Sequence, residues 1–204
     1  MTYKNLLFRE VFYFYIMNEA HNPWTVLNQR TIYDNKWIGL TEYDVINPGG
    51  GKGIYGKVRF KSLAIGILPL DNRGYTCLVG QYRFPLDAYS WEIPEGGGDL
   101  LVAPVESAQR ELLEETGLVA SEWTELMQMH LSNSVSDEHA FIFLARGLQQ
   151  REAAPEETEE LVVRRLAFDE AYRMAECGEI TDSMSVAAIL KVKLMLLQGQ
   201  LSIP

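Results

Sequence analysis

The 204-residue sequence is poor in cysteine and in basic residues, and both shortages restrict what the protein can be. Its two cysteines, Cys77 and Cys177, lie far apart and form no CxxC motif, so we expect two buried thiols in a reducing compartment and a cytoplasmic protein. The 18 lysines and arginines are outnumbered by 28 aspartates and glutamates, which gives a formal net charge of −10. Because broad binding to nucleic acid or to an anionic membrane needs a continuous basic surface, the composition argues against both partners.

The sequence also lacks a hydrophobic run long enough to cross a bilayer, which needs about 20 apolar residues. The apolar stretch VFYFYIM near the N-terminus is followed by the polar stretch NEAHNP, without a secretory cleavage pattern. We interpret residues 1–21 as an N-terminal leader and hypothesise that Met17 is the natural start, which the intact mass of natively initiated protein would test. His130 and His139 have no metal-ligand spacing with each other or with a cysteine, so neither is expected to bind zinc.

The remaining sequence reads as strands first and helices later. Two runs rich in β-branched and aromatic residues, 24–33 and 36–45, are separated by Asp-Asn and predict a β-hairpin. After the glycine-rich break NPGGGKG, the runs KVRFKSLAIGILPL and YTCLVGQYRF flank the turn DNRG and predict a second strand pair. We therefore expect a strand layer over residues 22–54 and a larger domain over residues 55–204, which ends in two helices.

The stretch SAQRELLEETGL lies in the middle of the chain and predicts a helix over residues 104–116. Pro104 suits the first helical turn, Glu106 favours its positive end, and Gly117 can take the left-handed conformation that ends a helix. Three apolar residues at helical spacing share one face and predict its contact with the core: Val105, Ala108 and Leu112.

Three glutamates crowd one turn of this helix. Glu111 and Glu115 are one turn apart, and Glu114 is the neighbour of Glu111 at the i+3 position. Carboxylates this close repel one another at neutral pH, and hard divalent cations relieve the repulsion. A solvated acidic face is the alternative interpretation. The flanking stretch WEIPEGGG and the helix-ending glycine favour a metal site, because glycines let the backbone approach an anion or a metal.

These residues together form a recognisable pattern. Gly96 is followed fourteen residues later by Arg110 and then by the three glutamates and Gly117, which resembles the Nudix box of pyrophosphohydrolases. Val102 stands where that box has its first glutamate, so an ion pair from this position to Arg110 is missing. The stretches GQYRFPLDAYSWEIPEGG, SNSVSDEHAFIFLARG and GEITDSMSVAAILK are similar to the ADP-ribose and nucleoside-diphosphate-sugar hydrolase branch. The resemblance implies an α/β fold, a Nudix α/β/α sandwich with an N-terminal antiparallel β layer that often contributes to a homodimer.

The resemblance also implies a metal site on the helix, with Mg²⁺ or Mn²⁺ as the cofactor. Glu111 and Glu115 would bind the metal together with the backbone carbonyl of Glu95. Glu114 would bind a further ion or hold the water network. Arg110 would orient the glutamates, and a structural salt bridge is a compatible alternative.

Catalytic and substrate-binding residues outside the helix follow from the same resemblance. Glu138 matches the loop glutamate that some relatives use as general base; a solvated carboxylate is the alternative. Asp137 is the neighbour that would substitute, and Glu114 or a metal-bound hydroxide is the competing base. The expected substrate contacts are Glu92 near the substrate, Arg83 toward a pyrophosphate, Arg59 assisting it, and Trp37 stacked on a nucleobase. Packing is the alternative role for Glu92, solvent exposure for Arg59, and a core position for Trp37.

The function implied is Mg²⁺-dependent hydrolysis of a small nucleotide. The expected reaction cleaves the pyrophosphate of ADP-ribose or of a nucleoside-diphosphate sugar into a nucleoside monophosphate and a sugar phosphate. Hydrolysis of nucleoside triphosphates or dinucleoside polyphosphates is the alternative within the family. The non-enzymatic alternative is a nucleotide-binding regulatory module without catalytic activity, and Val102 is the only residue that supports it.

Overall fold

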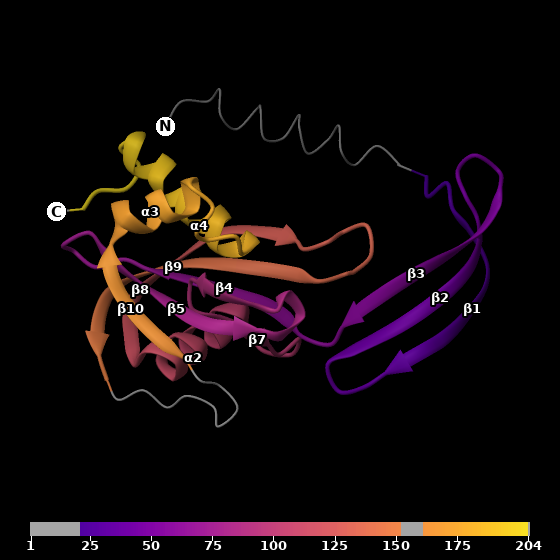
Figure 1. Ribbon diagram of the computed structural model, residues 1–204, viewed down its shortest axis with the longest axis horizontal. Helices are drawn as coiled ribbons and strands as arrows, with labels where there is room; N and C mark the ends of the chain where they lie inside the picture. Colours follow the sequence, from indigo (N-terminus) through magenta and orange to yellow (C-terminus); the bar gives the residue numbers. More distant parts are fainter. Residues whose placement is uncertain (1–20, 152–160, 204) are drawn as a thin grey trace. The chain divides into compact units, whose positions relative to one another are not determined.

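The computed structural model describes residues 21–151 and 161–203 (Figure 1). The predicted leader of residues 1–21, apart from its last residue, and the hypothesised start at Met17 therefore lie outside the described residues. The chain divides into two compact units. The first consists of the described residues up to Asp34 together with Leu40–Lys57, and the second of Asn35–Gly39 and the described residues from Val58 onward.

Three strands near the N-terminus form one sheet in the order β1-β2-β3: β1 (Thr25–Asp34), β2 (Ile38–Ile46) and β3 (Lys52–Phe60). The predicted hairpin is confirmed, since β1 and β2 are neighbours joined by a three-residue turn. Asn35 shapes that turn, because its side-chain oxygen accepts hydrogen bonds from the N–H groups of Trp37 and Ile38, each at 2.8 Å. All ten residues of β1 are exposed.

The second unit contains two further sheets. The four-stranded sheet has the order β7-β4-β9-β8, and the three-stranded sheet has the order β10-β5-β6. Only the β4–β9 pairing is parallel among the pairings within these two sheets. The strands are β4 (Leu63–Pro69), β5 (Tyr75–Arg83), β6 (Ala88–Glu92), β7 (Glu95–Gly98), β8 (Leu118–His130), β9 (His139–Gln150) and β10 (Val162–Ala167). The helices are η1 (Phe84–Leu86), α2 (Pro104–Thr116), α3 (Phe168–Glu176) and α4 (Ser183–Leu197).

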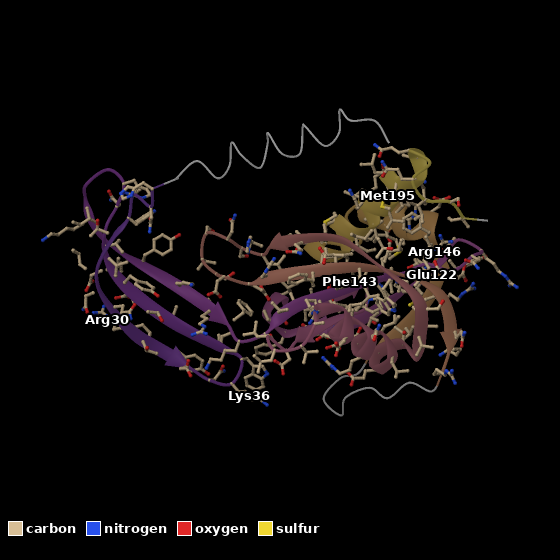
Figure 2. The ribbon with its side chains drawn as sticks, turned by 180° about the vertical axis from the view of Figure 1, so that it is seen from behind. Arg30, Lys36, Glu122, Phe143, Arg146 and Met195 are labelled. Carbon is tan, nitrogen blue, oxygen red and sulfur yellow. The ribbon has the colours of Figure 1, made fainter. Side chains whose placement is uncertain are left out.

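The four-stranded sheet is covered on both faces. Along β4, Ile65 and Ile67 belong to a buried cluster that contains Ala108 and Leu112 of α2, as well as Phe143. Ala64 and Leu68, which alternate with them along the strand, belong to a second cluster that contains residues of α3 and α4. Figure 1 shows α2 on one side of the sheet and α3 with α4 on the other, and Figure 2 labels Phe143 in its interior. The predicted α/β/α sandwich is confirmed.

Two expectations about the strands and the cysteines are wrong. The strands β4 and β5 do not form a pair but lie in different sheets, and the run KVRFKSLAIGILPL is divided between β3 and β4 at residues 61–62. Because β4 is apolar on both faces, its pattern carries no information about its partner, which is the distant strand β9. Cys177 is exposed rather than buried, whereas Cys77 is buried and burial raises its pKa to about 12.

The central helix agrees with its prediction. α2 begins at Pro104 and ends at Thr116, and Gly117 has φ of +69°, with its N–H donating to the carbonyl of Leu113 at 2.9 Å. Within the ranges 21–151 and 161–203, no helix is both long and apolar enough to span a membrane.

Candidate active site

Arg110 holds the acidic face of α2 together. Its guanidinium donates to Glu114 at 2.5 Å, to Glu111 at 2.6 Å and to the backbone carbonyl of Gly97 at 2.8 Å. Glu111 is 8% exposed and the neighbouring Glu115 is 6% exposed, whereas Glu114 lies nearer the surface. The arginine therefore fixes two of the three glutamates and ties them to the glycine-rich strand β7.

The glycine-rich strand lies directly against this helix. A Cβ atom on Gly96 would lie 2.3–2.4 Å from the carboxylate atoms of Glu111, so any larger residue here would displace that carboxylate. One oxygen of Glu115 accepts the N–H of Glu95 at 3.0 Å. Val102, which replaces the box glutamate, is 37% exposed. The bond from Arg110 to the carbonyl of Gly97 connects the helix to β7 without a glutamate at position 102.

A cavity of about 630 Å³ opens beside β7, and all its lining residues belong to the second unit. Strands β4 to β7, the loop before β9 and the start of α4 contribute to its walls. The cavity brings together five site residues predicted from the sequence: Trp37, Arg83, Glu92, Glu95 and Glu138. It also contains Asp182, which was not predicted.

Arg83 is the centre of the charged wall of this cavity. Its Nε donates to both oxygens of Glu92 at 2.9 and 3.0 Å, and its Nη2 donates to Glu92 at 2.5 Å and to Glu95 at 2.7 Å. Burial opposes its charge, yet the bonds and charges of these carboxylates raise the pKa of Arg83, which stays protonated. Glu92 is only 3% exposed, so its buried charge depends on this arginine.

Glu95 is a strongly perturbed acid of the site. Burial, together with the carboxylates of Asp182 and Glu92, raises the pKa of Glu95 well above its usual range, although Arg83 lowers it. No donor among the described residues bonds its Oε2 atom, and a hydrogen bond that protonated Glu95 shares with Asp182 also raises its pKa. A cation that replaced this proton would gain a carboxylate ligand in an acidic cavity.

Asp182 is a cavity residue that sequence reasoning missed. Its side chain accepts the N–H of Ser185 at 2.7 Å and so caps α4, which places its carboxylate at the cavity wall. The sequence carried a signal for the cap, because an aspartate precedes the helical stretch SMSVAAILK. Nothing in that local pattern indicated that the cap faces a cavity.

Glu138 and Asp137 are neighbours with different surroundings. Glu138 is half-buried and lines the cavity, and this burial raises the pKa of Glu138. Asp137 is anchored to β3: its carboxylate accepts the N–H of Phe60 at 3.0 Å, and its own N–H donates to the carbonyl of Val58 at 3.2 Å. The side chain of Asp137 thus fixes the loop that presents Glu138.

Trp37 and Arg59 differ in their relation to the cavity. Trp37 lines it and is 64% exposed, so it is not a core residue; the Nζ of Lys36 lies 4.2 Å from its ring centroid. Arg59 is exposed on β3 and is not among the lining residues, so its assistance to substrate binding stays a prediction.

The donor set fits a hard divalent cation by its chemistry. Glu111 and Glu115 are buried carboxylates, and Glu95 adds an oxygen that no donor among the described residues bonds. In the part of the chain that the structure describes, no three acidic, histidine or cysteine side chains already converge as a ligand cluster. Arg110 on the helix and Arg83 on the cavity wall each form ion pairs with two carboxylates. These pairs offset the repulsion between the carboxylates, which a bound cation would otherwise relieve.

Comparison with known proteins agrees with this arrangement. Residues 61–183 match the NUDIX domain, and residues 24–58 match the nucleoside diphosphate sugar hydrolase N-terminal domain. An ADP-ribose pyrophosphatase of Mycobacterium tuberculosis is 31% identical over 85% of this chain and 84% of that protein. One of Bacillus subtilis is 31% identical over 80% of this chain and 89% of that protein.

A solved structure supports the fold independently. The crystal structure of an ADP compounds hydrolase superposes with a TM-score of 0.78, covering 90% of this chain and 98% of that one at 22% identity. The resemblance found in the sequence is thereby confirmed for the family and for the fold. Because the NUDIX match covers more than half of the chain, this protein belongs to the Nudix family and is a hydrolase of phosphorus-containing anhydrides.

Proposed function

We propose that the protein hydrolyses the pyrophosphate of ADP-ribose or of a nucleoside-diphosphate sugar, releasing a nucleoside monophosphate and a sugar phosphate. The cavity of about 630 Å³ carries this proposal, because it lies within the usual size range of small-molecule sites and joins β7 to an exposed aromatic ring. The two pyrophosphatase relatives and the N-terminal domain match support the same substrate class.

We propose Mg²⁺ or Mn²⁺ as the cofactor, in a family that generally uses divalent metals. Glu111, Glu115 and the backbone carbonyl of Glu95 would hold it, and Glu114 would hold a further ion or its water network. A bound divalent ion would neutralise phosphate charge and make a water molecule more acidic. Because the protein has a net charge of −10, it repels a polyanionic substrate, and such a cation would offset this repulsion.

Glu138 is the general base of this proposal. A water oxygen forms a bond to phosphorus while the bridging P–O bond breaks, and the carboxylate of Glu138 takes the proton from the water. Glu138 suits this role because it lines the cavity and its raised pKa makes it a stronger base than an ordinary glutamate. Asp137 is less suited, since its carboxylate is held by the backbone of β3.

The arginines and the tryptophan position the reactants. Arg83 holds Glu92 and Glu95 in place and directs its charge into the cavity toward a pyrophosphate. Arg110 orients Glu111 and Glu114. The ring of Trp37 would stack on the nucleobase, which an exposed and rigid π-face can do for any base.

We also propose a cytoplasmic homodimer that forms through the N-terminal sheet. Four apolar residues of β1 are each more than half exposed, a composition that favours burial against another surface: Val26, Leu27, Ile32 and Tyr33. Light scattering would show a mass twice that of the 23.2 kDa chain, and a single mass would contradict the dimer. The cytoplasmic proposal depends on the two free cysteines.

The decisive experiment is a substrate panel with purified protein and Mg²⁺. ADP-ribose and nucleoside-diphosphate sugars should give a nucleoside monophosphate and a sugar phosphate, resolved by anion-exchange chromatography. Nucleoside triphosphates and dinucleoside polyphosphates serve as comparison substrates; preferential cleavage of these would overturn the substrate class. EDTA should abolish turnover and Mg²⁺ or Mn²⁺ should restore it, so full activity after exhaustive chelation would rule out the metal site.

A further inference from the structure

Two histidines meet where β8 ends and β9 begins. His130 is the last residue of β8 and His139 is the first residue of β9, and the antiparallel register places them directly opposite each other. Their ring centroids lie 4.7 Å apart, with an angle of 24° between the ring planes. Residues 131–138 separate them in the sequence, so their spacing along the chain argued against a shared metal ion. The strand pairing brings together what that spacing keeps apart.

The backbone brings these two side chains as close as a sheet allows. The N–H of Leu131 donates to the carbonyl of Glu138 at 3.1 Å, so these two residues form a hydrogen-bonded position of the β8–β9 ladder. Hydrogen-bonded and non-hydrogen-bonded pairs alternate along an antiparallel ladder. The adjacent pair, His130 with His139, is therefore a non-hydrogen-bonded one, and facing side chains are closest at such positions.

The separation of the rings fits one metal ion held by both imidazoles. If each ring nitrogen lies about 2.1 Å from the ion and the two bonds meet at about 90–110°, the ring centres are about 4.5–5.3 Å apart. The observed 4.7 Å lies within this range. Among the described residues, the two rings contact each other and Phe141, and no side chain hydrogen-bonds to either imidazole. His130 is exposed and His139 is half-buried, so an ion in solvent can reach them.

Imidazole nitrogen selects a different class of metal from the carboxylates of α2. It suits Zn²⁺, Ni²⁺ and Cu²⁺, whereas Mg²⁺ prefers oxygen ligands. Neither histidine is among the residues that line the cavity of Glu138. His139 shares its face of β9 with Phe141, which packs against the cluster that contains α2 residues. We propose that His130 and His139 bind one transition-metal ion of this class, with water molecules as its other ligands.

This site is independent of the proposed hydrolysis, yet it lies at the base of the loop that presents Glu138. An ion bound to both histidines would join β8 to β9 directly beside the hydrogen bond from Leu131 to Glu138. Because an ion that binds only the paired strands stabilises that pairing, the bond should open less often when the site is filled. We therefore expect slower hydrogen exchange of the Leu131 amide in the metal-bound protein.

Zn²⁺ is the probe for this site. It is titrated into the full-length protein at saturating Mg²⁺, so that the oxygen ligands are already occupied. NMR of protein labelled on its histidine side chains should show the imidazole signals of His130 and His139 shifting together and saturating at one ion per chain, while those of His21 stay unchanged. His130→Gln and His139→Gln each remove one of the two protein ligands. Each should weaken Zn²⁺ binding, measured by calorimetry, at least about tenfold.

Two control variants test the other zinc-binding side chains that solvent can reach. His21→Gln removes the third histidine, and Cys177→Ser removes the exposed thiol, which lies 3.3 Å from Glu179. Both variants should bind Zn²⁺ as the wild type does. The proposal is overturned if the signals of His130 and His139 show no saturable response, or if both glutamine variants bind Zn²⁺ with wild-type affinity. An unchanged exchange rate of the Leu131 amide would contradict the effect on the loop.

Discussion

The charged residues of the site form two groups that are built in different ways. The helix group consists of Arg110, Glu111, Glu114 and Glu115, and its ion pairs join residues one and four positions apart on α2. The cavity group consists of Arg83, Glu92, Glu95, Glu138 and Asp182, which come from different strands, a loop and the start of α4. Each group contains one arginine that binds two carboxylates, so the same electrostatic arrangement is made once by local spacing and once by tertiary structure.

The arginines of the two groups differ in exposure, 44% for Arg110 and 34% for Arg83, and this separates their effects on activity and on stability. The side chain of Glu114 is 28% exposed and that of Arg110 is 44% exposed, so water screens their ion pair. The side chain of Glu92 is 3% exposed, and Arg83 supplies its counter-charge. We expect losses in the helix group to affect mainly turnover, whereas the arginine of the cavity group should also support the fold.

The largest expected effect tests which group supplies the base. Glu138→Gln should lower turnover by about 10²–10⁴ with little change in substrate binding, the usual range for a general base. If the helix group supplies the base instead, Glu138→Gln would cost less than about tenfold and Glu114→Gln would carry the large loss. Both variants should be measured at saturating Mg²⁺, because excess metal partly rescues a defect in metal affinity but not a missing base.

The pH profile provides a second measurement on Glu138. Burial raises the pKa of this carboxylate, and only its deprotonated form accepts a proton. Turnover should therefore fall as the pH drops through this raised pKa, at a higher pH than for an ordinary glutamate. The acidic limb should disappear in Glu138→Gln; an unchanged limb in that variant would assign the titration to another group.

The next effect tests the helix group. Glu115→Gln keeps the shape of the side chain and removes its charge, so it should cost about 10²–10³ in turnover while the fold persists. Glu106→Gln, in the exposed first turn of the same helix, is the matched control and should be active. A Glu115→Gln protein with native circular dichroism and a near-wild-type rate would show that this helix face is merely solvated.

A pair of glycines tests the junction between the groups. Gly96→Ala would drive a methyl group into the carboxylate of Glu111, and a displacement near 1 Å in a site can cost about 10²-fold in turnover. The nearest atom to a Cβ on Gly97 is the hydroxyl oxygen of Ser62 at 3.7 Å, so Gly97→Ala should be nearly silent. Equal rates for the two variants would contradict the close approach.

The smallest effect compares the two arginines by chemical denaturation. Arg83→Ala leaves the buried carboxylate of Glu92 unpaired and should lower the free energy of unfolding by about 2 kcal/mol, less than for a fully buried pair because Arg83 is partly exposed. Arg110→Ala should cost less, about 1 kcal/mol, because the arginine is 44% exposed and water screens its pair with Glu114, although the variant also removes the partner of the buried Glu111. The reverse order would show that exposure is a poor guide to these two groups.

The helix group was predictable from sequence because its information is local. The proline marks the start of α2, the spaced apolar residues define its buried face, and the glycine marks its end. The positions of the glutamates on the helix surface then follow from the helical period. Trp37 was predictable as a base-stacking candidate from its place after the first hairpin turn, but its position at the cavity was not.

The remaining features depended on contacts between distant segments. The fully apolar β4 gave no sign that it pairs with β9, and residues 61–62 contain neither glycine nor proline to mark the break between β3 and β4. The role of Asp182 was hidden because a helix cap looks the same in sequence whether or not it faces a cavity. The pairing of Arg83 with Glu92 likewise required the β5–β6 register.

The parallel pairing of β4 with β9 has a consequence for how the protein acquires activity during folding. It aligns Ala64 with Ala140 and Pro69 with Ala145, segments far apart in the chain, whereas α2 and the β8–β9 hairpin form from near neighbours. Closing such a distant parallel contact is slow compared with local helix and hairpin formation. In refolding, we expect helical circular dichroism to recover first and hydrolysis to recover later, when β4 joins β9 and brings β7 against α2. Simultaneous recovery of both signals would show that the local elements do not form ahead of this pairing.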